Sequence, residues 1–154
     1  MNIFEKRSII PTTMAQMIAF HNDPRALRWL TPPPIIMQRR FDRRTSLTEG
    51  ELEFTLLFGP LPVRWLARHE PGPTDTSFQD RMIRGPMRFW LHQHIFREVL
   101  GGIELTDHLE YEHQPGLQGI FTRLLFGGLP LQILFFYRHM QTRRIAPNYR
   151  KEGA

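Results

Sequence analysis

The chain has 154 residues, of which 41% are apolar and 12% aromatic, and it contains no cysteine. This length fits one domain with a sizeable core, the composition excludes a disordered chain, and the lack of cysteine excludes disulfides and thiolate chemistry. The net charge of +5 comes mostly from arginines spread along the chain, which is typical of a solvated surface, so no nucleic-acid partner is expected. The N-terminal segment is charged early and lacks the long apolar core of a signal peptide, which predicts a cytoplasmic protein.

The first part of the chain predicts one strand followed by two short helices. Residues 3–10 alternate between apolar and polar side chains, which is typical of a strand. Thr12 or Thr13 is suited to cap a short helix, and a second short helix is expected over residues 24–30, with proline at its first position. The prolines at 32–34 then force an extended backbone.

A series of strands follows, because short alternating segments are separated by turn-forming residues. Consecutive strands joined by short loops predict an antiparallel meander. The expected strands cover residues 35–44, 51–58, 61–69, 77–84, 88–98 and 103–112.

The C-terminal part predicts a long apolar helix over residues 117–144. Gly127, Gly128 and Pro130 predict a kink or break near residue 128. No uninterrupted apolar run reaches about 18 residues, so no stable membrane insertion is expected, although the dense apolar segment 129–137 is compatible with transient membrane contact. The side chains expected to pack on the sheet are Leu117, Phe121, Leu124, Leu125 and Leu131.

The segment 88–112 is the most informative stretch, because it places ionisable residues in a strand pattern. A two-residue turn at Gly101–Gly102 predicts a hairpin in which His92 pairs with Tyr111 and His94 with Leu109. A shift by one residue pair keeps the same parity, so the same side chains share one apolar face. That face is expected to carry Trp90, His92, His94, Phe96, Leu105, Asp107, Leu109 and Tyr111.

The two histidines and Asp107 are the candidates for chemistry. A carboxylate beside an imidazole sets its tautomer and raises its basicity, so the group could act as acid and base; the alternative is a structural carboxylate that is satisfied by its neighbours. The H-x-H pattern could also ligate a metal with Asp107, but no third ligand is securely placed, so no metal and no cofactor are predicted.

Two further groups have alternative interpretations. Asp80 shares strand parity with Phe78 and Met82, which predicts a second inward carboxylate. Arg138 and His139 lie near the end of the predicted helix, where they either complement the helix dipole or anchor an acidic ligand headgroup.

The segments GPMRFWLHQHIF, GGIELTDHLEYEHQPG and FFYRHMQTRR, in this order, resemble bacterial proteins of the SRPBCC superfamily, also called START-like or Bet v 1-like, in the group of polyketide cyclases and lipid-transport proteins. The resemblance covers essentially the whole chain. It implies an α+β helix-grip fold: a seven-stranded curved antiparallel sheet around a long C-terminal helix, with two short helices after strand 1. It also implies one START-like domain over residues 1–147, followed by a flexible tail over 148–154.

The resemblance implies a cavity between sheet and helix that binds a hydrophobic small molecule such as a lipid, a quinone or a polyketide-like compound. The alternatives are a cyclase- or aromatase-like enzyme that uses His92, His94 and Asp107, and an interaction module with a vestigial cavity. The oligomeric state is left open. The residues expected to line the ligand site are Trp90, His92, His94, Phe96, Asp107, Leu109, Tyr111, Phe121, Leu124 and Phe135.

Overall fold

The structure, a computed structural model, describes residues 1–151 and contains a seven-stranded antiparallel sheet in the order β1-β7-β6-β5-β4-β3-β2. The strands are β1 (Asn2–Ile10), β2 (Ile36–Asp42), β3 (Gly50–Phe58), β4 (Leu61–Pro71), β5 (Ser77–Arg84), β6 (Phe89–Val99) and β7 (Gly102–Glu112). The helices are α1 (Met14–Asn22), α2 (Ala26–Trp29), α3 (Gly116–Phe126) and α4 (Gly128–Ile145), followed by the 3₁₀ helix η1 (Ala146–Asn148).

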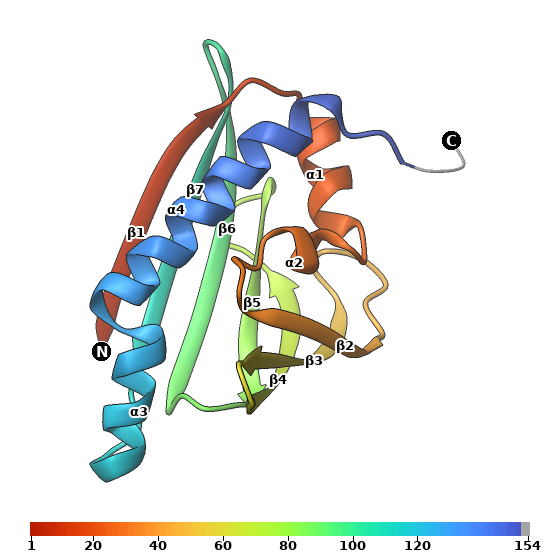
Figure 1. Ribbon diagram of the computed structural model, residues 1–154. Helices are drawn as coiled ribbons and strands as arrows, with labels where there is room; N and C mark the ends of the chain where they lie inside the picture. Colours follow the sequence, from red (N-terminus) through yellow and green to blue (C-terminus); the bar gives the residue numbers. More distant parts are fainter. Residues whose placement is uncertain (152–154) are drawn as a thin grey trace.

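The curved sheet holds the C-terminal helix against one of its faces, which confirms the predicted helix-grip architecture. Figure 1 shows α4 running along the side of the sheet formed by β1 and β7, with α1 and α2 toward the other side. From β2 to β7 each strand pairs with the next strand along the chain, and β1 joins the sheet as the edge strand beside β7. The expected meander from the second strand to the seventh is therefore confirmed.

Helix α1 begins where the sequence predicts, and Thr13 is its capping residue. The Thr13 hydroxyl accepts a hydrogen bond from the Gln16 amide at 3.2 Å, and the Gln16 side chain accepts one from the Thr13 amide at 3.4 Å. This reciprocal capping box satisfies two donors that the first helical turn leaves without intrahelical partners.

The β6–β7 hairpin has the predicted parity but a different register. Val99 pairs with Gly102, so the turn is formed by Leu100 and Gly101, and the predicted turn at Gly101–Gly102 is wrong by one residue. His94 consequently lies opposite Asp107, whereas the predicted pairing with Leu109 is wrong. The shift by one residue pair leaves every side chain on its expected face, because strand side chains alternate with period two.

The C-terminal helix is broken into α3 and α4 at Gly127, as predicted. Gly127 has extended backbone dihedrals and Gly128 has a φ of +46°, a conformation that favours glycine. The prediction that Leu117 and Leu124 are buried is wrong, because they are 85% and 69% exposed, and Phe121 is also exposed. Because the break at Gly127 separates α3 from α4, α3 packs with a different face than a continuous helix would, and its buried residues are Gly119, Thr122 and Phe126.

Helix α4 has one buried face and one apolar outer face. Leu131, Phe135 and His139 are buried against the sheet, while Ile133 and Phe136 are exposed. The stretch Gly116–Asn148 is long and apolar enough, by length and composition, to cross a membrane. Its most apolar 18 residues have a mean hydropathy of 1.5, and 33% of them are buried in the protein. The sequence prediction that no stable membrane insertion occurs was based on the lack of an uninterrupted apolar run, whereas mean hydropathy tolerates interruptions.

The end of the described chain packs against α1 and α2. The Tyr149 hydroxyl donates to Asp23 Oδ2 at 2.7 Å, and its ring lies 6.0 Å from that of Phe20. The tail predicted from residue 148 therefore begins within a packed segment, and its residues 152–154 lie outside the described chain.

Candidate functional site

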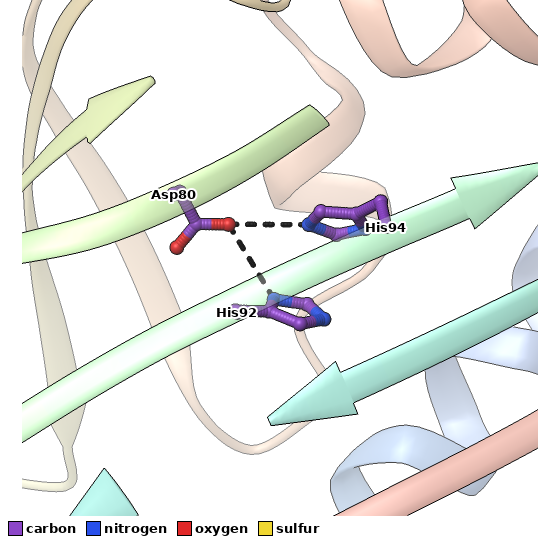
Figure 2. A group of neighbouring side chains, drawn as sticks. All are labelled: Asp80, His92 and His94. Atoms are coloured by element: carbon purple, nitrogen blue, oxygen red, sulfur yellow. Dashed lines mark hydrogen bonds and ion pairs between the residues drawn. The ribbon is translucent and has the colours of Figure 1, made fainter. Parts of the chain in front are cut away.

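Four ionisable side chains, Asp80, His92, His94 and Asp107, meet on the inner face of the adjacent strands β5, β6 and β7. The β6–β7 register places His94 opposite Asp107, and the β5–β6 register places Asp80 opposite His92. Since directly opposed residues on antiparallel strands have neighbouring Cβ atoms, strand pairing alone assembles this group. Figure 2 shows Asp80 directing one carboxylate oxygen toward both imidazoles.

Each of the two imidazoles lies between the same two carboxylates. Asp80 Oδ2 is 3.4 Å from His92 Nδ1 and 3.1 Å from His94 Nε2. On the other side, Asp107 Oδ1 is 2.9 Å from His92 Nε2 and 3.1 Å from His94 Nδ1. His94 Nδ1 is therefore a buried nitrogen that faces the Asp107 carboxylate as an ion-pair contact rather than as an ideal hydrogen bond.

Helix α4 adds a third histidine to the group. His139 Nε2 is 2.8 Å from Asp107 Oδ2, and His139 Nδ1 is 2.7 Å from the Ser8 hydroxyl on β1. Asp107 therefore receives hydrogen bonds at both oxygens, as a buried carboxylate requires. The chain of contacts from Ser8 to Asp80 ties β1, α4, β7, β6 and β5 together through side chains.

The charges of this network depend on one another. Burial acts to lower the pKa of His92, but Asp107 and Asp80 outweigh it and raise that pKa to about 9. Burial likewise acts to raise the pKa of both carboxyls, yet the neighbouring histidines hold the pKa of Asp80 and of Asp107 well below the usual range. At neutral pH, His92 is thus an imidazolium that bridges two carboxylates.

A cavity of about 440 Å³ opens beside this network, between the sheet and the helices. Its walls are mostly apolar, and its polar side chains include Asp80, His92 and His94. The apolar walls come from the loop after α2, from strands β3, β4 and β6, and from both C-terminal helices. The apolar residues of these elements that line the cavity include Leu30, Ile35, Leu52, Phe54, Leu56, Phe58, Trp65, Ala67, Trp90, Leu125, Phe126, Ile133 and Leu134. The predicted cavity between sheet and helix is present.

Arg138 also lines this cavity, and its guanidinium lies over the ring of Phe135. Burial lowers its pKa, while Asp107 and Asp80 act to raise it. Its Nε atom is buried and has no hydrogen-bond partner within the described residues. The interpretation of Arg138 and His139 as a cap at the end of the helix is wrong, because α4 continues to Ile145 and its last turn carries Arg143 and Arg144.

The predicted ligand residues fall into three groups. Trp90, His92, His94 and Leu124 line the cavity. Asp107, Phe96, Leu109 and Phe135 are buried and do not line it: Asp107 orients the histidines, and the other three lie in the core. Tyr111 and Phe121 line separate surface depressions of about 730 and 440 Å³.

Two further histidines line the cavity, and the sequence analysis did not predict them at the site. The contact of His139 with Asp107 was not predicted either. His21 on α1 and His69 on β4 line the cavity and hydrogen-bond the carbonyls of Met17 and Leu47, each at 2.9 Å. Burial lowers the pKa of His21 to about 3, with His94 also acting to lower it, so this imidazole is neutral at physiological pH. The sequence signal for His139 was its position four residues after Phe135, on the same helix face.

No family model and no curated protein matches the chain. Solved structures do match: protein CV1439 from Chromobacterium violaceum superposes with a TM-score of 0.70 at 11% identity, covering 94% of this chain and 96% of that one. The structure of Ara h 8.0201 gives 0.58 at 11% identity, covering 91% and 97%. The chain has the START-like, Bet v 1-like helix-grip fold.

A third match has higher sequence identity and covers only part of a longer protein. A nucleoside-diphosphate sugar epimerase from Corynebacterium glutamicum matches at 25% identity with a TM-score of 0.67. The match covers 92% of this chain and 28% of the epimerase chain. The helix-grip fold thus also occurs as one part of a larger enzyme.

Proposed function

We propose that this protein binds a hydrophobic small molecule with one polar end, of the lipid, quinone or polyketide-like class. The observation that carries the proposal is the 440 Å³ cavity, whose apolar walls end at a polar group of histidine, aspartate and arginine side chains. A pocket of this kind takes up an apolar ligand by removing its surface from water, while a few placed polar groups fix its orientation. The fold supports the proposal, because the resemblance to Bet v 1-like proteins implies a cavity for a hydrophobic ligand and the structure has such a fold.

The polar end of the ligand is expected to carry oxygen. Arg138 lines the cavity, and its Nε is buried and has no hydrogen-bond partner within the described chain. A buried polar group without a partner costs about 1–3 kcal/mol, so a ligand that satisfies this nitrogen gains affinity from it. A carbonyl, hydroxyl or carboxylate oxygen matches this group.

The cavity can be tested by filling it. Ala67→Phe places a large side chain in the wall formed by β4, where Ala67 is buried and lines the cavity. Ala15→Phe, at an exposed position of α1, is the matched control. Fatty acids, quinones and flat polycyclic compounds are screened by thermal shift. We expect members of one class to stabilise the wild type and the control, because they bind only the native state, and to leave Ala67→Phe unchanged. Equal shifts in all three proteins, or none in any, would refute the proposal.

Transient contact with an anionic membrane is the second part of this proposal. The outer face of α3 and α4 exposes a row of large apolar side chains: Leu117, Ile120, Leu124, Leu129, Ile133, Phe136 and Met140. The segment 116–148 contains arginines but no aspartate or glutamate. An apolar face next to basic residues favours the surface of anionic lipid. Leu124 and Ile133 also line the cavity, so its opening lies on this face.

Vesicle co-sedimentation tests the membrane contact. The double variant Leu129→Ser/Phe136→Ser should lose most binding to anionic vesicles, whereas Leu100→Ser should bind like the wild type. Leu100 is 99% exposed at the tip of the β6–β7 hairpin and is therefore a matched apolar control away from the helices. Equal sedimentation of all three proteins would contradict this contact.

A cyclase- or aromatase-like activity is the second candidate, and the state of His94 favours it. Its Nε2 lies 3.1 Å from Asp80 and its Nδ1 lies 3.1 Å from Asp107, and carboxylates beside an imidazole orient the ring and raise its basicity. Such a base would remove a proton from a bound polyketide-like compound. The two candidates differ in outcome: a binding protein returns the bound compound unchanged, and an enzyme converts it at a rate that His94→Gln abolishes.

A further inference from the structure

The ligand-type atoms of Asp80, His92 and His94 converge on one point at the cavity wall (Figure 2). Asp80 Oδ2 lies 3.4 Å from His92 Nδ1 and 3.1 Å from His94 Nε2, and all three atoms lie within 4.8 Å of one another. Around a zinc ion with bonds of about 2.0–2.1 Å, tetrahedral ligand atoms are about 3.3 Å apart. The spacing of the carboxylate oxygen from both nitrogens therefore fits a single shared ion.

We propose that Asp80, His92 and His94 bind one divalent transition-metal ion, of the Zn²⁺ or Fe²⁺ type. Two imidazoles and one carboxylate suit these ions, whereas Mg²⁺ and Ca²⁺ prefer sites made only of oxygen. No metal was predicted from the sequence, because the H-x-H pattern lacked a secure third ligand. The structure supplies that ligand from β5: strand pairing puts Asp80 opposite His92, so the donor comes from Asp80 rather than from Asp107.

Asp107 supports the same assignment from the other side of the imidazoles. His92 uses Nε2 to contact Asp107 at 2.9 Å, which leaves Nδ1 facing Asp80, and a bound ion would replace the proton that Nδ1 carries in the imidazolium. His94 faces Asp107 with Nδ1 and Asp80 with Nε2. A carboxylate on the second nitrogen fixes the tautomer of a metal-binding histidine and orients its ring. Asp107 hydrogen-bonds His92 and lies in ion-pair contact with His94, and His139 holds that carboxylate in place at 2.8 Å.

The ion would have coordination positions open to the cavity, because all three of its ligands line that cavity. Three protein ligands with a remaining open position are typical of sites that also bind a substrate or water. An oxygen at the polar end of a cavity ligand could occupy that position. The site itself requires no organic ligand, so its test is independent of the proposed binding function.

The test is a metal titration of untagged, chelator-treated protein. Cobalt(II) is followed by its visible absorption, and zinc binding is measured by calorimetry, both without any organic ligand. We expect one ion per chain and the absorption of a low-symmetry Co²⁺ site. Asp80→Asn and His94→Gln should each weaken binding at least 100-fold, and Asp107→Asn should weaken it about 10- to 100-fold through the orientation of the histidines.

His108→Gln is the matched control, because His108 also lies near two carboxylates, at 3.1 Å from Glu5 and 3.7 Å from Glu110, but on the surface. It should bind the metal like the wild type. Circular dichroism establishes that each variant is folded; if Asp80→Asn is not, His94→Gln alone decides. A wild type that binds no ion stoichiometrically, a folded His94→Gln variant that binds like the wild type, or loss of binding in His108→Gln would each overturn the proposal.

Discussion

Asp107 is the residue on which the buried network depends. It contacts His92 at 2.9 Å and His139 at 2.8 Å, and both histidines are buried. Breaking a buried charge pair by removing one partner costs about 3–5 kcal/mol, because the remaining charge stays desolvated. We therefore expect Asp107→Asn to lower the free energy of unfolding by about 3 kcal/mol, as measured by urea denaturation.

Glu112→Gln is the control for this substitution. Among residues 1–151, the Glu112 carboxylate makes longer ion-pair contacts of 3.6 Å with the N-terminus and with Arg88. Exposed pairs of this kind contribute less than about 1 kcal/mol. If Asp107→Asn cost no more than Glu112→Gln, the network would not be a stabilising feature.

Asp23 gives the fold a dependence on acid pH. Hydrogen bonds from Arg25 lower its pKa to about 2, with a further contribution from the Tyr149 hydroxyl at 2.7 Å. A carboxyl with a lowered native pKa stabilises the fold above its unfolded pKa of about 4, and this contribution is lost as the pH falls toward 2. Tyr149→Phe removes one hydrogen bond to the charged form.

We expect Tyr149→Phe to reduce the stability at pH 7 by about 1 kcal/mol. The difference from the wild type should shrink as the pH falls from 4 to 2, because Asp23 becomes protonated over that range. Thermal or urea unfolding at several pH values measures both quantities. A difference that stayed constant down to pH 2 would show that the hydroxyl acts independently of the Asp23 charge.

Among the elements, the β6–β7 hairpin depends on a glycine at the start of β7. Gly102 has a φ of +140°, and a Cβ atom there would collide with the Ile10 carbonyl at the end of β1. We expect Gly102→Ala to destabilise the protein by at least about 2 kcal/mol, because both the dihedral and the contact are unfavourable.

Gly59→Asn is the corresponding control in the β3–β4 turn. Gly59 has a φ of +61°, no heavy atom lies within 4 Å of the place that a Cβ atom would take, and asparagine tolerates this conformation. Its cost should stay below about 1 kcal/mol in the same denaturant experiment. Similar costs for the two substitutions would mean that the contact with Ile10 does not matter.

The elements also show what the sequence could determine. The alternation of His92 and His94 predicted their inward direction, because parity survives a register shift. The register between β6 and β7 depended on which two residues form the turn. Two adjacent glycines did not distinguish a turn at Leu100–Gly101 from one at Gly101–Gly102. The inward face of α3 could not be read from its apolar residues, since the helix break changes its direction and leaves an apolar stripe in solvent.

At the scale of the whole molecule, the site is assembled from distant parts of the chain. Ser8, Asp80 and His139 belong to β1, β5 and α4, and only the pairing of the strands and the packing of α4 on the sheet bring them to Asp107 and the two histidines. Strand parity predicted that Asp80 points inward, but not that its oxygen meets both imidazoles. The lining of the cavity by the loop after α2 followed from tertiary packing, for which the proline-rich sequence gave no signal.

The presence of an apolar molecule in the cavity is tested most directly by native mass spectrometry of untagged protein purified from its own host. We expect wild-type protein and Ala15→Phe to carry the added mass of a small apolar compound, which denaturation releases. Ala67→Phe, whose cavity is filled, should appear at the mass of the chain alone or with metal only. Wild-type protein without added organic mass that also shows no thermal shift with any compound, or Ala67→Phe with the same added mass as the wild type, would contradict this expectation.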